Sequence, residues 1–247
     1  MEILPVPVDD NGLDITSGIQ NYPDARFALI TPAHQSPLGV ALSLARRHQI
    51  LEWADRSQAW IIEDDYDSEF RYHGKPLPAL KSLDAPQRVI YAGTFSKALF
   101  PALRCAWLVV PVKQITQFRH QASLAPCAVP VLWQNTLADF LREGHFWRHL
   151  KKMRQHYAQR RQWIEQALTQ QGFQVVPQKG GIQMVIRMIG DDIAHARKAN
   201  AAGLAVQALS DWRIHSSGEG GLLLSFTNIV NEAMARQVAQ QLRKALS

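Results

Sequence analysis

The segments WIIEDDYDSEF (Trp60–Phe70) and VIYAGTFSKALF (Val89–Phe100) decide the fold. Each begins with a short apolar run, Trp60–Ile62 in the first and Val89–Ala92 in the second, and each run gives way abruptly to polar or charged residues. Short apolar runs separated by amphipathic stretches are typical of strands that a parallel sheet buries on both faces. The two segments therefore predict two strands of an α/β domain, each followed by a polar loop.

The same alternation extends outward from these two segments. Phe27–Thr31 and Ala106–Val110 are further short apolar runs, ended by Pro32 and Pro111, and Leu42–Arg56 has apolar residues at helical spacing. Strands that alternate with helices in this way indicate a mostly parallel sheet. The first half of the chain is therefore predicted to be α/β.

Beyond Pro111 the pattern becomes helical over residues 113–170, with Arg142–Arg161 read as one long helix and Gly172 as its C-terminal stop. A smaller α+β part is predicted to follow. Its expected strands are Phe173–Val176, Ile182–Met188 and Leu222–Phe226, and its expected helices are Asp192–Ala202 and Asn231–Leu246.

The composition is that of an ordinary globular protein and gives no sign of disorder. Hydrophobic residues make up 47% of the 247, and 27 Lys and Arg face 21 Asp and Glu, which gives a net charge of +6. Many basic residues fall within Arg142–Arg161, where a solvated helix face is the simplest interpretation. Because no recognition motif accompanies them, we do not expect this chain itself to bind DNA specifically.

The chain carries no signal for export or for a membrane. Its first residues lack a basic and apolar leader, and no apolar run approaches the length of a membrane span. Cys105 and Cys127 have no spacing that suggests a metal site or a disulfide framework. A cytoplasmic protein without a metal site is expected.

Chemically reactive side chains follow the two central strands. Glu63–Asp67 follows the first, and Thr94–Lys97 follows the second and continues to Arg104. Ligands of open α/β sheets bind beyond the carboxyl ends of the strands. Alone, each fragment is usually a turn or a surface residue. Together they supply an amine, a carboxylate, a phenol, a hydroxyl and a guanidinium, which suit pyridoxal 5'-phosphate.

At this point a resemblance is plain. Ile61–Asp84, Val89–Arg104, Thr31–Gly39 and Asp139–Arg161 together resemble the aminotransferase-like domain of MocR-type regulators of the GntR superfamily. The resemblance implies a partial fold-type-I, pyridoxal-phosphate-dependent transferase domain. It places a partial large cofactor-binding domain at residues 1–145, a connecting helix at 146–171 and a small α+β domain at 172–247.

The resemblance also implies roles for individual residues. Lys97 is similar to the lysine that forms the Schiff base, Asp64 to the partner of the pyridine nitrogen, and Tyr66 to the partner of the ring oxygen. Thr94 and Arg104 resemble phosphate ligands. Ser36 stands where aminotransferases commonly have an asparagine that contacts the ring oxygen, and this departure weakens its assignment.

Other departures concern parts that the family has and this chain lacks. The family's winged-helix domain and the first part of its aminotransferase-like domain are missing, so we expect exposed apolar sheet surface and weak cofactor binding. Leucines occupy Leu222–Leu224, where working aminotransferases place an arginine that clamps the substrate carboxylate. Gly180–Gln183 lacks the family's usual histidine. His215 could contact an anion, although a surface histidine is the simpler interpretation.

Three functions remain open at this stage. The first is a sensor domain that binds the cofactor and an amine or amino-acid effector, which the helical segment Asp139–Arg161 and the leucines at Leu222–Leu224 favour over an enzyme. The second is an aminotransferase that exchanges amino groups with a 2-keto acid, and the third is a nonfunctional fragment. A homodimer is expected from the fold type. DNA would be bound only through the absent N-terminal domain.

Overall fold

The computed structural model describes residues 2–124, 129–214 and 218–247, so Cys127 and His215 lie outside the described residues. The chain divides into two compact units, which are described separately. Unit 1 comprises Met1–Ser36, Val40–Glu69 and Lys75–Leu150, and unit 2 comprises Pro37–Gly39, Phe70–Gly74 and Lys151–Ser247. No helix in the described ranges is both long enough and apolar enough to cross a membrane.

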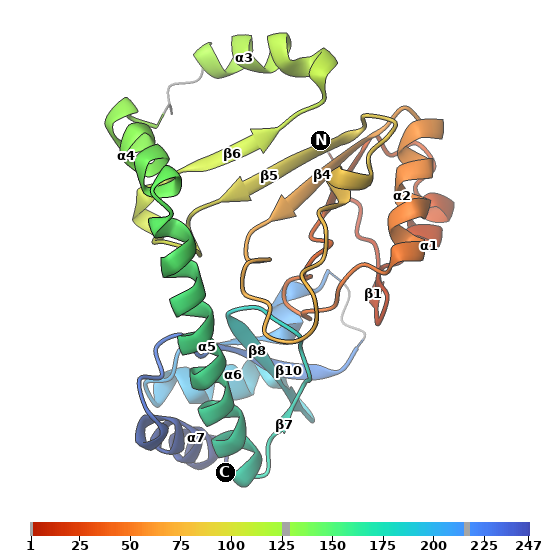
Figure 1. The fold of residues 1–247 in the computed structure, drawn as a ribbon. Helices are drawn as coiled ribbons and strands as arrows, with labels where there is room; N and C mark the ends of the chain where they lie inside the picture. The colour runs from red at the N-terminus through yellow and green to blue at the C-terminus, as the bar shows by residue number, and fades with distance from the viewer. Residues whose placement is uncertain (1, 125–128, 215–217) are drawn as a thin grey trace. The chain divides into compact units, whose positions relative to one another are not determined.

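Unit 1 is built on a four-stranded sheet (Figure 1). Its strands are β3 (Phe27–Ile30), β4 (Trp60–Asp65), β5 (Val89–Thr94) and β6 (Ala106–Val109), in that order across the sheet. The first three run parallel and β6 is antiparallel to β5. The predicted α/β class with a mostly parallel sheet is confirmed.

The two central strands are longer than the sequence predicts. Glu63–Asp65 belongs to β4 and Thr94 is the last residue of β5, although the sequence pattern predicts loops at these positions. The charged end of β4 can stay in the sheet because Glu63, only 1% exposed, accepts hydrogen bonds from the main-chain N–H groups of Leu80 and Lys81 at 2.7 and 2.8 Å. A buried carboxylate with two such donors is satisfied without solvent.

One face of this sheet is covered by helices. Helices α1 (Ile15–Asn21) and α2 (Leu44–Arg56) contact each other and lie on the same side of the strands in Figure 1. Their shared core with the sheet includes Ile50, Ile61 and Val89, each at most 1% exposed. Ser43 begins α2 as an N-cap, its hydroxyl accepting from the N–H of Arg46.

The opposite face of the sheet is largely open. Phe27 and Leu29 of β3 are 56% and 69% exposed, and Leu108 of β6 is 55% exposed. Helix α3 (Ile115–Leu124) has no buried residue. A groove of about 320 Å³ lies at the amino ends of the strands, lined by Phe27, Trp60, Ile90, Gln114, Gln117, Phe118 and Gln121. The exposed apolar sheet surface expected from the sequence is present on this face.

Short elements complete unit 1. They are the hairpin β1 (Val8–Asp9) and β2 (Gly12–Leu13), the 3-10 turns η1 (Leu80–Leu83), η2 (Pro101–Leu103) and η3 (Val112–Gln114), helix α4 (Val131–Arg142) and the first residues of α5 (His145–Gln170). The prediction of one helix over Arg142–Arg161 is wrong at its start. Gly144 adopts a left-handed φ of 73°, which ends α4 and separates it from α5.

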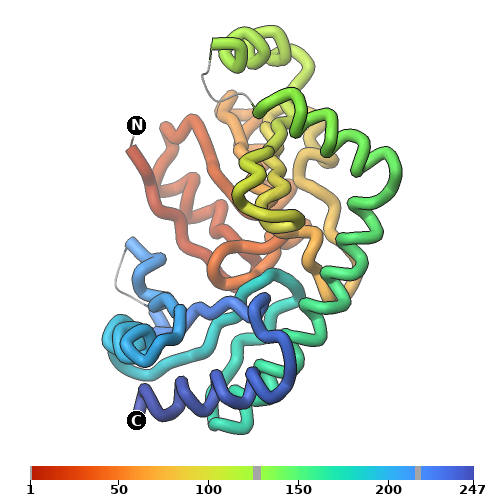
Figure 2. The backbone as a smooth tube through the Cα atoms, turned by 90° about the vertical axis from the view of Figure 1, so that its left-hand side faces the viewer, coloured from red at the N-terminus to blue at the C-terminus, as the bar shows by residue number. Residues whose placement is uncertain are grey.

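Unit 2 holds an antiparallel sheet in the order β7-β8-β10-β9. The strands are β7 (Gln174–Val175), β8 (Gln183–Met188), β9 (Val206–Ala208) and β10 (Gly220–Ser225). Helix α6 (Asp192–Ala201) joins β8 to β9, the 3-10 turn η4 (Leu209–Trp212) lies between β9 and β10, and α7 (Glu232–Leu246) follows β10. Helices α6 and α7 pack together and lie side by side in Figures 1 and 2.

The core of unit 2 is closed. Leu222, Phe226 and Leu242 are all fully buried in one cluster with residues of α5, α6 and α7. Gly172 ends α5 as predicted: its φ is 81°, and the N–H of Phe173 bonds to the carbonyl of Leu168, the six-to-one bond of a Schellman motif. Phe173 then packs into the same core.

Candidate functional site

The sheet register of unit 1 places two of the predicted site residues on one face. Asp64 of β4 pairs with Ala92 of β5, and Thr94 follows two residues later. Because side chains alternate along a strand, Asp64 and Thr94 project from the same face, at the carboxyl ends of neighbouring parallel strands. The predicted site therefore lies at the edge of the sheet where α/β proteins bind ligands.

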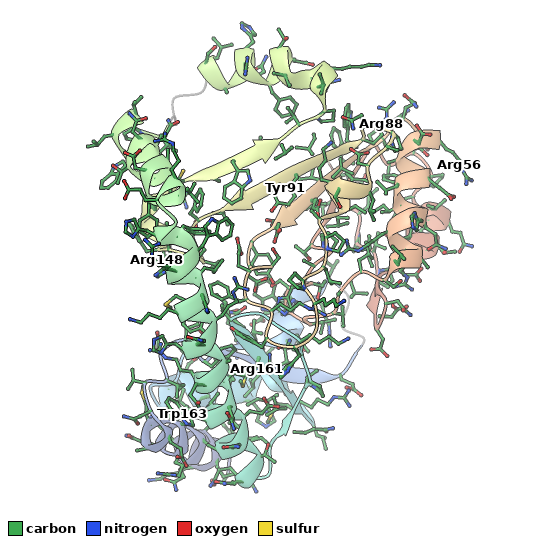
Figure 3. The ribbon with its side chains drawn as sticks, in the orientation of Figure 1. Arg56, Arg88, Tyr91, Arg148, Arg161 and Trp163 are labelled. Carbon is green, nitrogen blue, oxygen red and sulfur yellow. The ribbon has the colours of Figure 1, made fainter. Side chains whose placement is uncertain are left out.

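The structure separates the roles of the two adjacent aspartates. Asp65 is fully engaged, since its carboxylate accepts from the N–H and the hydroxyl of Ser68 at 3.2 and 2.8 Å and from the hydroxyl of Tyr91 at 2.8 Å. Figure 3 labels Tyr91 on β5. The side chain of Asp64 has no hydrogen bond to any residue that the structure describes.

Asp64 is also an electrostatically unfavourable anion. Burial raises its pKa, and the nearby carboxylates of Asp65 and Asp67 raise it further. A carboxylate of this kind is stabilised by a cation or by a strong N–H donor. Asp64 is thus the acidic group at this edge that can bind a positively charged ligand atom.

Tyr66 lies directly after β4 and contacts the loop that carries Ser36. Its hydroxyl donates to the main-chain oxygen of His34 at 3.1 Å and is hydrogen-bonded to the side chain of Ser36. Burial, reinforced by Asp67, raises the pKa of Tyr66 well above its ordinary value. The phenol is therefore neutral at physiological pH and can donate a hydrogen bond to an anionic oxygen.

The turn after β5 presents hydroxyl groups and an amine. The main-chain N–H of Ser96 bonds to the Thr94 hydroxyl oxygen at 3.1 Å, and the two hydroxyl oxygens lie 2.9 Å apart. Lys97 follows and its side chain is exposed. The turn thus offers two neutral hydroxyl groups beside a primary amine.

The start of α5 holds this turn in place within unit 1. The ring of Phe146 meets that of Phe95 edge-on, with centroids 5.7 Å apart. The imidazole Nε2 of His149 donates to the carbonyl of Ala98 at 2.9 Å. Because the residues on both sides of Lys97 are anchored, the main chain that carries its amine is fixed.

Arg104 has an unusual backbone conformation. Its φ and ψ of 50° and 34° are left-handed, a region in which a non-glycine residue costs roughly 1 kcal/mol or more. Its side chain is exposed. In the described ranges, no hydrogen bond or ion pair joins Arg104 or Lys97 to Asp64, Tyr66 or Thr94. The structure therefore brings Asp64 near Thr94 and Tyr66 near Ser36, and it leaves the two cations unpaired with them.

Sequence reasoning missed three contributors to this edge of the sheet. His34 contacts both Tyr66 and Asp67, and Ser96 shares the hydroxyl pair with Thr94. All three lie in segments quoted for other residues, and only their side-chain contacts distinguish them. The described part of the chain contains no group of three or more His, Cys, Asp or Glu arranged to hold a metal ion.

The chain is similar to known proteins over most of its length. Residues 1–220 match the family described as "Aminotransferase class I and II". The chain is 36% identical to the "Probable rhizopine catabolism regulatory protein MocR" of Rhizobium meliloti, over 99% of this chain and 50% of that protein. It is 32% identical to the "HTH-type pyridoxine biosynthesis transcriptional regulator PdxR" of Corynebacterium glutamicum, over 100% and 53%.

Solved structures show the same fold. The kynurenine aminotransferase of Pyrococcus horikoshii, crystallised with PMP, has a TM-score of 0.86 at 25% identity, covering 98% of this chain and 63% of that one. A multiple substrate aminotransferase from Thermococcus profundus has a TM-score of 0.86 at 26% identity, covering 99% and 64%. The chain thus spans about half the length of the curated relatives and under two thirds of the solved enzymes.

Proposed function

Because the chain belongs to the aminotransferase class I and II family, we propose that it is the pyridoxal-phosphate-binding effector domain of a MocR-type transcriptional regulator. The observation that carries this proposal is the placement of Asp64, Tyr66, Thr94 and Lys97 at the carboxyl ends of β4 and β5, with Asp64 lacking a partner in the described structure. We keep 1–145, 146–171 and 172–247 as the proposed functional division of the chain.

The residues at this edge fit the proposed cofactor. Asp64 would accept the N–H of a protonated pyridine nitrogen, which relieves the unfavourable anion that burial creates. Tyr66, a neutral phenol beside Ser36, would donate to the ring oxygen. The hydroxyl of Thr94 and the guanidinium of Arg104 would bind the phosphate dianion.

Lys97 would supply the remaining group, a primary amine that would hold the cofactor through its aldehyde. When bound, the cofactor supplies an electron sink for a substrate carbanion. The part of the protein in that chemistry would be electrostatic. Asp64 would keep the pyridine nitrogen protonated, and Tyr66 would stabilise the anionic ring oxygen. Lys97 can also accept or return a proton beside the ring.

Unit 2 favours a sensor over an aminotransferase. Leu222, Leu223 and Leu224 of β10 are 0%, 2% and 9% exposed, so they serve as core residues. These positions supply no guanidinium to clamp a substrate carboxylate. We infer that an amine or amino-acid effector acts by shifting the conformation of the domain, not by undergoing efficient turnover.

The proposed partners follow from the family. DNA would be bound through a further N-terminal domain such as the relatives named as HTH-type regulators imply. A homodimer is supported by apolar side chains on the surface of unit 1: Val131, Leu132, Trp133 and Trp147 are 69%, 72%, 50% and 61% exposed. Sedimentation equilibrium would show a monomer if that part of the proposal is wrong.

A cofactor titration tests the proposed function. Absorbance should reveal saturable binding of pyridoxal phosphate, weaker than a dissociation constant of about 1 µM (about −8 kcal/mol) because this chain offers few phosphate donors. The change should vanish in Lys97→Ala and persist in Lys113→Ala, a matched exposed lysine. Binding that is the same in all three proteins would contradict the proposal, and turnover of an amino acid with 2-oxoglutarate would favour the aminotransferase instead.

A further inference from the structure

His34 contacts the hydroxyl of Tyr66 twice. Its main-chain oxygen accepts the Tyr66 hydrogen bond at 3.1 Å, and its imidazole Nδ1 lies 3.2 Å from the same hydroxyl oxygen. The Oδ2 atom of Asp67 lies 3.3 Å from that Nδ1. The side chains of His34 and Asp67 are 11% and 2% exposed, and Tyr66 is partly buried, so solvent has little access to the His34–Asp67 contact.

A count of hydrogens assigns the donor in this cluster. The Tyr66 hydroxyl has one hydrogen, which the main-chain oxygen of His34 accepts, so the Ser36 hydroxyl is a donor to the Tyr66 oxygen. An ionised carboxylate such as that of Asp67 has none to donate. The imidazole must therefore carry its hydrogen on Nδ1, where it is shared between the Tyr66 oxygen and Asp67.

The other imidazole nitrogen makes no competing contact. Nε2 of His34 is buried and has no hydrogen-bond partner in the part of the chain that the structure describes. Every polar contact found for this ring is thus made through Nδ1, and those contacts tie it to Tyr66 and Asp67. The ring has no link to the surface that would explain it as a solvated histidine.

We propose that His34 is a positioning residue for Tyr66. Its Nδ1–H, oriented by Asp67, donates to the tyrosine oxygen and fixes the phenol ring. When an anionic ligand oxygen replaces the main-chain oxygen of His34 as the acceptor, the same contact makes the hydroxyl a stronger donor to that oxygen. A hydroxyl that accepts a hydrogen bond is a better donor, because hydrogen bonds in a chain polarise one another. The inference rests on the proposed function for the identity of the ligand, whereas the His34–Tyr66 contact exists without it.

Nitrogen NMR of the ligand-free chain tests that contact directly. Long-range ¹H–¹⁵N spectra distinguish an imidazole protonated on Nδ1 from one protonated on Nε2, and the His34 signals are assigned by their loss in His34→Asn. We expect the Nδ1–H form. An Nε2–H form would overturn the proposal, whether or not the chain binds the cofactor.

Affinity measurements test the consequence for the ligand. His34→Phe should weaken pyridoxal-phosphate binding about fivefold, as expected for the loss of one hydrogen bond, whereas His34→Asn retains a donor near Nδ1 and should stay within about twofold. In a Tyr66→Phe background, His34→Phe should have no further effect, because the histidine acts through the tyrosine. His120→Phe, at an exposed position on α3, is the matched control.

The outcomes separate this inference from the proposed function. The role of His34 would be overturned, while cofactor binding stands, if His34→Phe and His34→Asn lose equal affinity for the cofactor. It would also be overturned if His34→Phe reduces affinity as much in the Tyr66→Phe background as in the wild type. Absence of binding in every protein would refute the proposed function, and the NMR result would then decide the role of His34 alone. If His34→Phe does not fold, the Asn variant and the NMR spectra still decide it.

Discussion

Two acidic residues, Asp192 in unit 2 and Asp64 in unit 1, have opposite surroundings. In unit 2, Asp192 is 3% exposed and accepts the main-chain N–H groups of Gly221 and Ser210 at 2.8 and 3.1 Å. Burial works against its charge, but these hydrogen bonds win and hold the pKa of Asp192 below its usual range. In unit 1, Asp64 has no such donor in the described structure, and burial raises its pKa.

The same contrast holds for leucines in the two sheets. Leu222 of β10 is fully buried in the core of unit 2, whereas Leu29 of β3 in unit 1 is 69% exposed. Asp192 and Leu222 of unit 2 are therefore satisfied by residues of their own unit. Unit 1 leaves both an acidic group and an apolar face without partners, which is what a site for a ligand and a surface for further polypeptide require.

The largest expected effect is at the two leucines. Leu222→Ala should lower the free energy of unfolding by about 3 kcal/mol, because a buried leucine leaves a cavity, whereas Leu29→Ala should change it by less than about 0.5 kcal/mol. Urea unfolding followed by circular dichroism measures both. Similar losses in the two variants would show that the open face of unit 1 is not open in solution.

Asp192→Asn should have the next largest effect. Loss of a charged acceptor from two main-chain donors is expected to cost about 2 kcal/mol of unfolding free energy. Asp191→Asn is the matched control, since Asp191 is the N-cap of α6 and asparagine caps a helix equally well. A variant as stable as its control would mean that Asp192 does not stabilise unit 2.

Asp64→Asn should weaken the ligand and spare the fold. Loss of the charge opposite a protonated ring nitrogen is expected to reduce affinity for pyridoxal phosphate about tenfold or more, while stability of the free chain is maintained. The titration used for Lys97→Ala measures this, with the exposed Asp55→Asn as the control. Unchanged affinity would assign the acidic role to another residue.

The pH dependence of stability should distinguish the same two aspartates by sign. The folded-state pKa of Asp64 is raised, so its ionisation destabilises the fold as pH rises from the unfolded value of about 3.9 through the raised value. Over that range the free energy of unfolding of Asp64→Asn should therefore rise relative to that of the wild type. For Asp192, whose folded-state pKa is lowered, the stabilisation is present above about pH 3.9 and is lost as pH falls through the lowered value. Urea unfolding at several acid pH values gives the free energy of unfolding of each variant relative to the wild type. If that difference changes with pH in the same direction for Asp64→Asn and Asp192→Asn, the assignment is wrong.

Local signals allowed much of the fold to be predicted. The apolar runs marked β3, β4, β5 and β6, and Gly172 marked the end of α5, because these features depend on neighbouring residues. The ends of β4 and β5 were placed too early. Glu63 stays in its strand only because main-chain N–H groups some 17 positions away bond to it, and no local pattern shows that.

The candidate site was predictable in its residue types and not in its contacts. The sequence pointed to Asp64, but the choice between Asp64 and Asp65 is supported only by the hydrogen bonds of Tyr91 and Ser68 to Asp65. His34 was passed over because its contact with Tyr66 spans 32 positions of the chain. Contacts of this length come from tertiary packing, which periodicity and motif spacing do not encode.

Reduction of the complex tests the central claim most directly. Borohydride treatment of the chain with pyridoxal phosphate would attach the cofactor permanently to the amine that binds it. Peptide mass mapping would then identify that amine. We expect one dominant label, on Lys97, that decreases when Asp64→Asn weakens binding. A label spread over exposed lysines such as Lys113, Lys151 and Lys152, with none favoured, would contradict it.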